Sequence, residues 1–127
     1  MSIVNCKVEH IRPTYNNLKE WTEDNNNVYI ERGWVVFFNK QRFPLFSSNF
    51  TNPYKIGRDG TREELIDKYR NYITQKLENN KSLQDELIMM KNKNLGCWCY
   101  PEMCHGNILS DIYYTKLNNY NFNIKNL

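Results

Sequence analysis

The spacing of apolar residues predicts four short strands along the chain. Apolar and polar residues alternate over residues 3–8, where Val4, Cys6 and Val8 share the face expected to enter the core. Short apolar runs at residues 28–30, 34–38 and 95–99 predict the other three strands. Polar residues and Pro101 bound the last run, which indicates a strand buried in the sheet. Residues 39–51 follow no regular pattern and predict an irregular loop.

Apolar residues at helical spacing predict four helices. Pro13 fits the first turn of a helix over residues 13–21. Thr61 and Glu64 form a capping-box pattern before a helix that ends near residue 79, and Ser82 is expected to cap the next helix. The last helix is expected over residues 106–117. The residues expected to face inward on the last three helices are Leu65, Tyr69, Tyr72, Ile73 and Leu77; Leu83, Leu87 and Met90; and Ile108, Leu109, Ile112 and Tyr113.

Strands that alternate with helices are typical of α/β proteins with a layered sheet. We therefore expect a compact three-layer α/β domain with a small mixed or mostly parallel sheet; the Rossmann-like form of this domain is what the family resemblance given below implies. A length of 127 residues suits one domain over residues 1–127 with a single core. Residues 115–127 are rich in Asn and form a C-terminal tail in this prediction.

The composition limits the classes of protein that the chain can belong to. Aromatic residues make up 14% of the sequence, too many for a disordered chain, and no apolar run is long enough to span a membrane. The N-terminus carries no basic and apolar leader, so a cytoplasmic protein is expected, in the host cytoplasm if the source is a virus. Twenty Asn and no Ala indicate a low-GC genome, such as that of a virus, phage, protist or AT-rich bacterium. The net charge of +3 is weak evidence for a nucleic-acid partner, and small basic domains of this kind often form homodimers.

Residues 97–107, Cys-Trp-Cys-Tyr-Pro-Glu-Met-Cys-His-Gly-Asn, are the most informative segment of the sequence. They predict a strand, a tight turn and a helix start, the place where open α/β sheets bind ligands and where free N–H groups favour anions. At this start, Gly106 would let a ligand approach the backbone, Cys104 would be favoured as a reactive thiolate, and His105 could transfer a proton.

These motifs resemble those of the family designated domain of unknown function 4326. The resemblance covers residues 28–114 and rests on Asn52-Pro53, Ile56-Gly57, the Asp-Gly-Thr-Arg-Glu-Glu segment at residues 59–64, Cys97-Trp98-Cys99, Pro101 and Cys104-His105-Gly106. The chain departs from the family pattern at Glu31-Arg32-Gly33, where Gly-Arg is usual, and at Asn49-Phe50-Thr51-Asn52-Pro53, where Trp-Gly-Asn-Pro is usual. The resemblance implies a compact Rossmann-type domain suited to a nucleotide or another phosphate-bearing ligand.

We therefore expect a nucleotide or nucleotide-derived ligand in a pocket between residues 52–62 and 99–107, with or without turnover. Arg62 stands at a helix start, where a cation is locally unfavourable, so we assign it to a phosphate; a salt bridge to a nearby carboxylate is the alternative. The other expected ligand-binding residues are Asn52, Thr61, Gly106, Asn107 and Arg32. If the protein is an enzyme, His105, Cys104 or Glu64 would be the reactive group, although Glu64 also fits a purely structural cap.

Two further hypotheses compete with this one. The first is a zinc-stabilised module that binds nucleic acid or protein without catalysis, with Cys97, Cys99, Cys104 and His105 as ligands. Adjacent side chains such as Cys104 and His105 rarely reach one tetrahedral ion, and Cys97 and Cys99 equally suit a packed strand, so zinc is not the favoured interpretation. The second is a protein that sequesters a signalling nucleotide without turnover.

Overall fold

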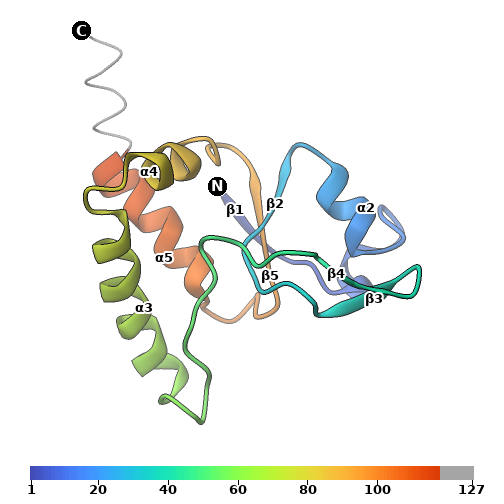
Figure 1. Cartoon of the computed structure of the whole chain (residues 1–127), viewed down its shortest axis with the longest axis horizontal. Helices are drawn as coiled ribbons and strands as arrows, with labels where there is room; N and C mark the ends of the chain where they lie inside the picture. Colours follow the sequence, from blue (N-terminus) through green and yellow to red (C-terminus); the bar gives the residue numbers. More distant parts are fainter. Residues whose placement is uncertain (118–127) are drawn as a thin grey trace, which may run out of the picture. The chain divides into compact units, whose positions relative to one another are not determined.

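The central strand of the sheet is the strand that comes last in the chain. In the computed structural model, which describes residues 1–117, a parallel sheet has the order β1-β5-β2, with bounds β1 (Ser2–Asn5), β5 (Asn94–Cys97) and β2 (Asn27–Tyr29) (Figure 1). Val4 and Tyr29 both pair with Gly96. Leu95, Gly96 and Cys97 are all buried, as the apolar run predicts for a central parallel strand. The predicted α/β class with a small, mostly parallel sheet is confirmed.

The chain folds as two units, each built from two separate segments. The first unit consists of Met1–Thr51 and Asn92–Met103, and the second of Asn52–Lys91 and the residues from Cys104 onward. The first holds the parallel sheet, and the second is helical. Residues 118–127 of the predicted tail lie outside the described residues. The Rossmann-like layering and the single domain over residues 1–127 stay predictions.

Two short helices replace the single helix expected over residues 13–21. They are α1 (Val8–Ile11) and α2 (Leu18–Glu23), and Pro13 lies between them. The helix α2 begins after Asn17, whose side chain accepts a hydrogen bond from the backbone N–H of Glu20 at 2.9 Å. The Asn cap therefore determines the start of the helix, and the expectation based on Pro13 was wrong.

The first strand is also shorter than the predicted range of residues 3–8. It ends at Asn5, whose side chain accepts a hydrogen bond from the backbone N–H of Lys7 at 3.0 Å and turns the chain into α1. Cys6 is fully buried, as expected, whereas Val8 is exposed on α1 and does not belong to the core face.

A β-hairpin joins the strand predicted within residues 34–38 to a second strand in the segment that was expected to form an irregular loop. It consists of β3 (Val36–Phe38) and β4 (Gln41–Phe43), which pair antiparallel. Asn39 and Lys40 form its two-residue turn, with φ values of 49° and 65° that match the right-handed twist of the strands. The usual second residue of such a turn is Gly, so Lys40 hid the hairpin from sequence inspection.

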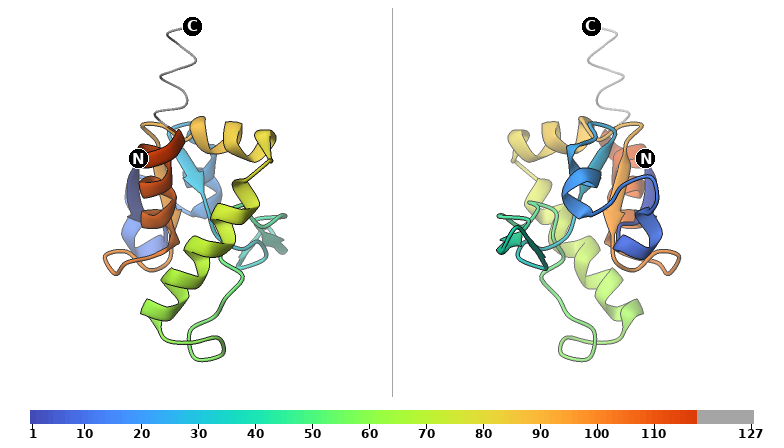
Figure 2. Two further views of the ribbon diagram at one scale, coloured as in Figure 1. Left: turned by 90° about the vertical axis from the view of Figure 1, so that its left-hand side faces the viewer. Right: turned by 90° about the vertical axis from the view of Figure 1, so that its right-hand side faces the viewer.

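The second unit contains the helices α3 (Arg62–Leu77), α4 (Lys81–Ile88) and α5 (His105–Ile112), followed by a π-helical turn over Tyr113–Leu117. Figure 2 shows α5 beside α3, with α4 near the C-terminal end of α3. The predicted inner faces are confirmed for the buried residues, and Tyr72 is half-buried. Asn80, not Ser82, caps α4, because its side chain accepts from the backbone N–H of Leu83 at 3.1 Å.

Candidate functional site

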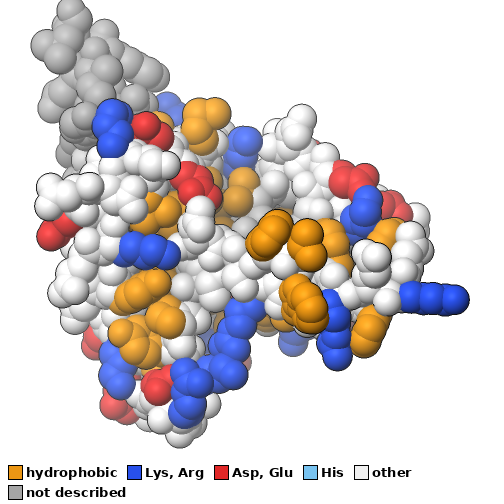
Figure 3. Space-filling model, viewed as in Figure 1, with side chains coloured by type: hydrophobic (Ala, Val, Ile, Leu, Met, Phe, Trp, Pro, Cys, Tyr) orange, Lys and Arg blue, Asp and Glu red, His pale blue; other side chains and the backbone are white. Residues whose placement is uncertain are grey.

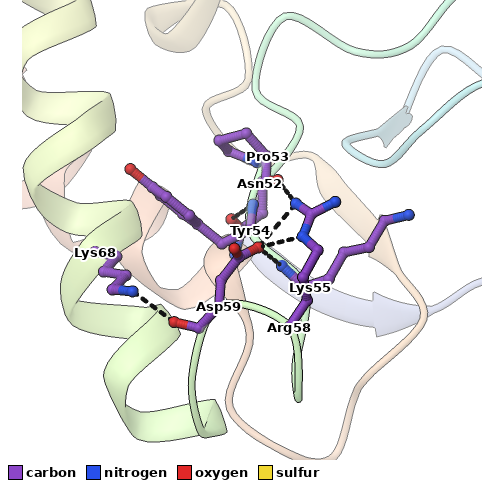
Figure 4. A network of polar contacts seen from close by, with 7 residues as sticks. All are labelled: Asn52, Pro53, Tyr54, Lys55, Arg58, Asp59 and Lys68. Atoms are coloured by element: carbon purple, nitrogen blue, oxygen red, sulfur yellow. Dashed lines mark hydrogen bonds and ion pairs between the residues drawn. The ribbon is translucent and has the colours of Figure 1, made fainter.

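The loop before α3 is organised around Asp59 (Figure 4). The Asp59 carboxylate accepts a hydrogen bond from the backbone N–H of Lys55 at 2.8 Å and pairs with Arg58 at 2.8 Å. Arg58 also donates to the carbonyl of Pro53 at 3.1 Å, and Lys68 on α3 donates to the Asp59 carbonyl. The Arg58 guanidinium holds the pKa of Asp59 below its usual value. These contacts give residues 53–59 a defined shape.

Three of the predicted site residues have structural roles, one in the loop before α3 and two at the start of that helix. The Asn52 side chain accepts from the backbone N–H of Tyr54 at 2.9 Å. Thr61 and Glu64 form the predicted capping box, in which each side chain accepts from the other's backbone N–H, at 3.3 and 3.2 Å. The hydrogen bond from the Thr61 backbone lowers the pKa of Glu64, which makes this carboxylate a weaker general base.

The predicted reactive residues at the start of α5 are buried. Cys104 is the N-cap residue, and its backbone N–H donates to the Asn107 side chain at 2.9 Å. Cys104, His105 and Gly106 are all buried. The His105 ring meets Tyr69 of α3 edge to face, with ring centroids 5.1 Å apart. The helix start therefore takes part in packing between α3 and α5.

The predicted pocket draws on residues from both units. Arg32 and Cys99 lie in the first unit, whereas residues 52–62 and 104–107 lie in the second. Within the second unit, Arg62 begins α3 seven residues before Tyr69, which is about 10 Å along the helix axis. The side chain that contacts His105 is thus two turns from Arg62. The ligand-binding and catalytic roles of these residues stay predictions.

A cluster of buried and half-buried polar groups lies at the carboxyl ends of the parallel strands. The thiol of Cys6, directly after β1, donates to the carbonyl of Cys97 at the end of β5 at 3.4 Å. The Cys6 backbone N–H donates to the same carbonyl at 2.9 Å. Tyr29 ends β2, and its hydroxyl donates to the Arg32 carbonyl at 2.5 Å. Burial raises the pKa of both Cys6 and Tyr29, so both groups are neutral near pH 7.

Glu31 belongs to this cluster and was not predicted as a site residue. Burial raises its pKa from 4.5 to about 7, and the neighbouring Cys97 adds to the rise. A hydrogen bond from the Trp98 backbone and the charge of Arg32 offset part of this effect. The sequence signal was the position of Glu31 directly after a predicted strand, where the family pattern has a different residue. A carboxyl group that titrates near pH 7 at this edge is suited to proton transfer.

A groove of about 540 Å³ lies beside this edge in the first unit. Cys6 and Trp98, which follow β1 and β5, contribute to its wall. Trp98 is half-buried and is held edge to face against Tyr29, with ring centroids 5.8 Å apart. The side chains that give the groove its chemical character are Lys7, Arg12, Lys19, Phe37, Phe38 and Trp98. The groove thus combines three cations with four aromatic rings, since Phe43 also lines it, and Glu9 adds one carboxylate.

The cysteines were also candidates for a metal site. None of the four is in a disulfide bond. Cys97 and Cys99 lie in the first unit, and Cys104 and His105 in the second. Over residues 1–117, no three His, Cys, Asp or Glu side chains are arranged so that they could hold a metal ion. The zinc hypothesis stays a prediction, which a direct measurement of the zinc content of the protein can test.

The fold and these sites define a small α/β protein with a three-stranded parallel sheet and polar groups at its carboxyl edge. The chain belongs to the family described as "Domain of unknown function (DUF4326)", whose model matches residues 14–115. This match confirms the predicted membership and begins before residue 28, where the sequence motifs start.

Two relatives are viral proteins. The "uncharacterized protein R718" of Acanthamoeba polyphaga mimivirus is 31% identical over 97 residues, which cover 70% of this chain and 68% of the relative. The "uncharacterized 12.4 kDa protein in nrdA-td intergenic region" of Enterobacteria phage T4 is 29% identical over 58 residues, 45% of this chain and 54% of the phage protein. No solved structure matches the chain. None of the helices within residues 1–117 combines the length and apolar character that crossing a membrane requires.

Proposed function

We propose that the chain binds a nucleotide or a nucleotide-derived small molecule, and that the groove of the first unit receives it. One observation carries the proposal: cations and aromatic rings share one groove beside the carboxyl ends of two adjacent parallel strands. Ligands of open α/β sheets bind at this edge, because the strand ends and the loops after them leave a crevice there. The volume of about 540 Å³ falls in the range of small-molecule sites.

The two kinds of side chain match the two parts of a nucleotide. Lys7, Arg12 and Lys19 are suited to the phosphate groups, because ammonium and guanidinium groups form charge-assisted hydrogen bonds with them. The rings of Phe38 and Trp98 offer apolar surface for the base. Lys19 lies 5.4 Å from the centre of the Phe38 ring and pairs with Glu23, so a bound phosphate would compete with that carboxylate.

Turnover and sequestering differ in what happens to the ligand after binding. An enzyme needs a group that can exchange a proton beside the ligand; the raised pKa of Glu31 suits proton exchange, but Glu31 is not among the residues that line the groove. A sequestering protein needs only the groove. Chromatography of the nucleotide after incubation with the protein separates these cases, because only an enzyme yields a new product.

Calorimetric titration with AMP, ADP, ATP and NAD tests the proposal. We expect at least one of them to bind, and Arg12→Ala and Lys19→Ala each to weaken binding roughly tenfold, the value of one charge-assisted hydrogen bond. The matched variants are Arg62→Ala and His105→Ala, which belong to the pocket predicted from the sequence. If only these two weaken binding, the ligand occupies that pocket and the groove assignment is wrong. Binding of none of the four ligands would overturn the proposal.

A further inference from the structure

The hairpin and the residues around it combine aromatic rings with positive charge and carry no acidic residue. Residues 32–51 contain six aromatic residues, three cations and neither Asp nor Glu. In Figure 3, hydrophobic and basic side chains gather over the part of the view where Figure 1 places β3 and β4. A segment of 20 residues without a carboxylate is notable in a chain with 14 acidic residues. This composition favours an anionic partner with apolar surfaces.

The hairpin has one face in the core and one face outside. Val36 and Phe43 form a directly paired position and pack against the buried cluster that contains Trp21. Phe37 and Arg42 form the next pair, and alternation along the strands puts both on the opposite face. Arg42 lies over the Phe37 ring at 4.2 Å from its centre, while 67% of Phe37 stays exposed.

The exposed rings continue beyond the paired strands. Trp34 is 60% exposed and Phe46 is 79% exposed, although large aromatic side chains are usually covered. The Trp34 indole N–H donates to the Leu45 carbonyl at 3.0 Å, which fixes the ring at the open end of the hairpin. Hydrogen bonds from the backbone N–H groups of Trp34 and Val35 to residues 44 and 43 hold the two segments together. The rings are therefore exposed on an ordered frame.

We infer that the exposed side chains of the hairpin segment, Trp34, Phe37, Arg42 and Phe46 with Lys40 at the turn, bind single-stranded nucleic acid. Unpaired bases stack on exposed aromatic rings, and cations between the rings contact the phosphates that link the bases. A neutral protein surface does not explain a segment that carries three cations and no carboxylate. Phe37 also lines the groove, whereas Trp34, Arg42 and Phe46 do not, so the test uses variants outside the groove and does not depend on the nucleotide proposed there.

Fluorescence anisotropy with labelled 20-nucleotide oligo(dT) and oligo(U) tests the inference. We expect the wild-type chain to bind, and Trp34→Ala and Phe46→Ala each to weaken binding roughly fivefold or more, the effect of losing one stacked base. Lys40→Gln and Arg42→Gln should each reduce the slope of log affinity against log salt by about 0.7, the value for one phosphate contact on a single strand. Trp34→Phe should keep binding and remove most of the quenching of tryptophan fluorescence by the oligonucleotide.

Met89→Ala and Lys91→Gln are the matched controls, since Met89 is 70% exposed and both residues belong to the second unit. Equal binding by the wild type and the Trp34 and Phe46 variants would overturn the inference, as would a wild type that binds phosphatidylserine vesicles but neither oligonucleotide. Circular dichroism spectra establish that each variant is folded. Titration of the hairpin variants with mononucleotides separates this inference from the groove proposal, because those variants leave Arg12 and Lys19 intact.

Discussion

The ring of Trp21 packs so closely on Gly96 that a Cβ atom at position 96 would lie 2.3 Å from the ring. Trp21 belongs to α2, and Gly96 lies in the central strand β5. The absence of a side chain at position 96 therefore lets α2 approach the sheet. This approach also positions one wall of the groove, because Leu18 and Lys19 of α2 line it.

We predict that Gly96→Ala lowers the free energy of unfolding by about 1–3 kcal/mol, because the added methyl group overlaps the Trp21 ring. Urea denaturation of the wild type and the variant measures this difference. In a Trp21→Leu background the same substitution should cost less, because the smaller side chain leaves space for the methyl group. An equal cost in both backgrounds would show that Trp21 is not the obstacle.

Glu31 makes the stability of the protein depend on pH. Its pKa rises to about 7 in the folded state from an ordinary value of 4.5, so folding favours the protonated form. The protonated form of Glu31 therefore contributes about 3 kcal/mol to the free energy of unfolding relative to the ionised form. This contribution is fully present below pH 4.5 and is lost as the pH rises through 7.

We predict that Glu31→Gln, which cannot ionise, is more stable than the wild type at pH 8. Across the window from pH 4.5 to 7, the stability of the variant should fall less than that of the wild type. Urea denaturation at a series of pH values checks both expectations, with Glu63→Gln as the control for an exposed carboxylate on α3. Parallel pH profiles for the wild type and Glu31→Gln would contradict the assignment.

Variants of the two capping-box residues distinguish a structural role of Glu64 from a catalytic one. We predict that Thr61→Ala lowers the free energy of unfolding by about 1 kcal/mol, because the backbone N–H of Glu64 loses its acceptor. Glu64→Gln should leave stability nearly unchanged, because Gln also completes a capping box. If a nucleotide is turned over, loss of turnover in Glu64→Gln at unchanged stability would restore Glu64 as a catalytic residue.

The buried thiols suit the core better than a metal site. The Cys6 thiol is fully buried, donates to the Cys97 carbonyl, and has its pKa raised by burial, which disfavours the thiolate that binds metal. We predict that EDTA leaves the Tm unchanged and that the purified protein contains no stoichiometric zinc by mass spectrometry. One zinc per chain together with a large drop in Tm would favour the zinc module, since structural zinc contributes on the order of 10 kcal/mol to folding.

Several predictions that rest on neighbouring residues are confirmed, although the helix start at Pro13 and the cap at Ser82 were wrong. The capping box of Thr61 and Glu64, the buried run that became β5 and the inner faces of α3 and α4 all depend on spacings of four residues or fewer. Such patterns are visible in the sequence, because the groups that satisfy one another are adjacent along the chain. Where two local signals competed, as between Pro13 and Asn17 for the start of a helix, the side chain that could accept a backbone hydrogen bond determined the outcome.

The sequence by itself determined the α/β class, the family and most element positions, because periodicity and caps are local properties. Only the tertiary structure decided what the elements do together. It paired β3 with β4, partly buried Glu31, and brought Lys7, Phe38 and Trp98 to one groove. These outcomes depend on contacts between residues far apart in the chain, in one case across the 91 positions from Cys6 to Cys97. Burial and its effect on pKa arise from that packing, so no local pattern of residues records them.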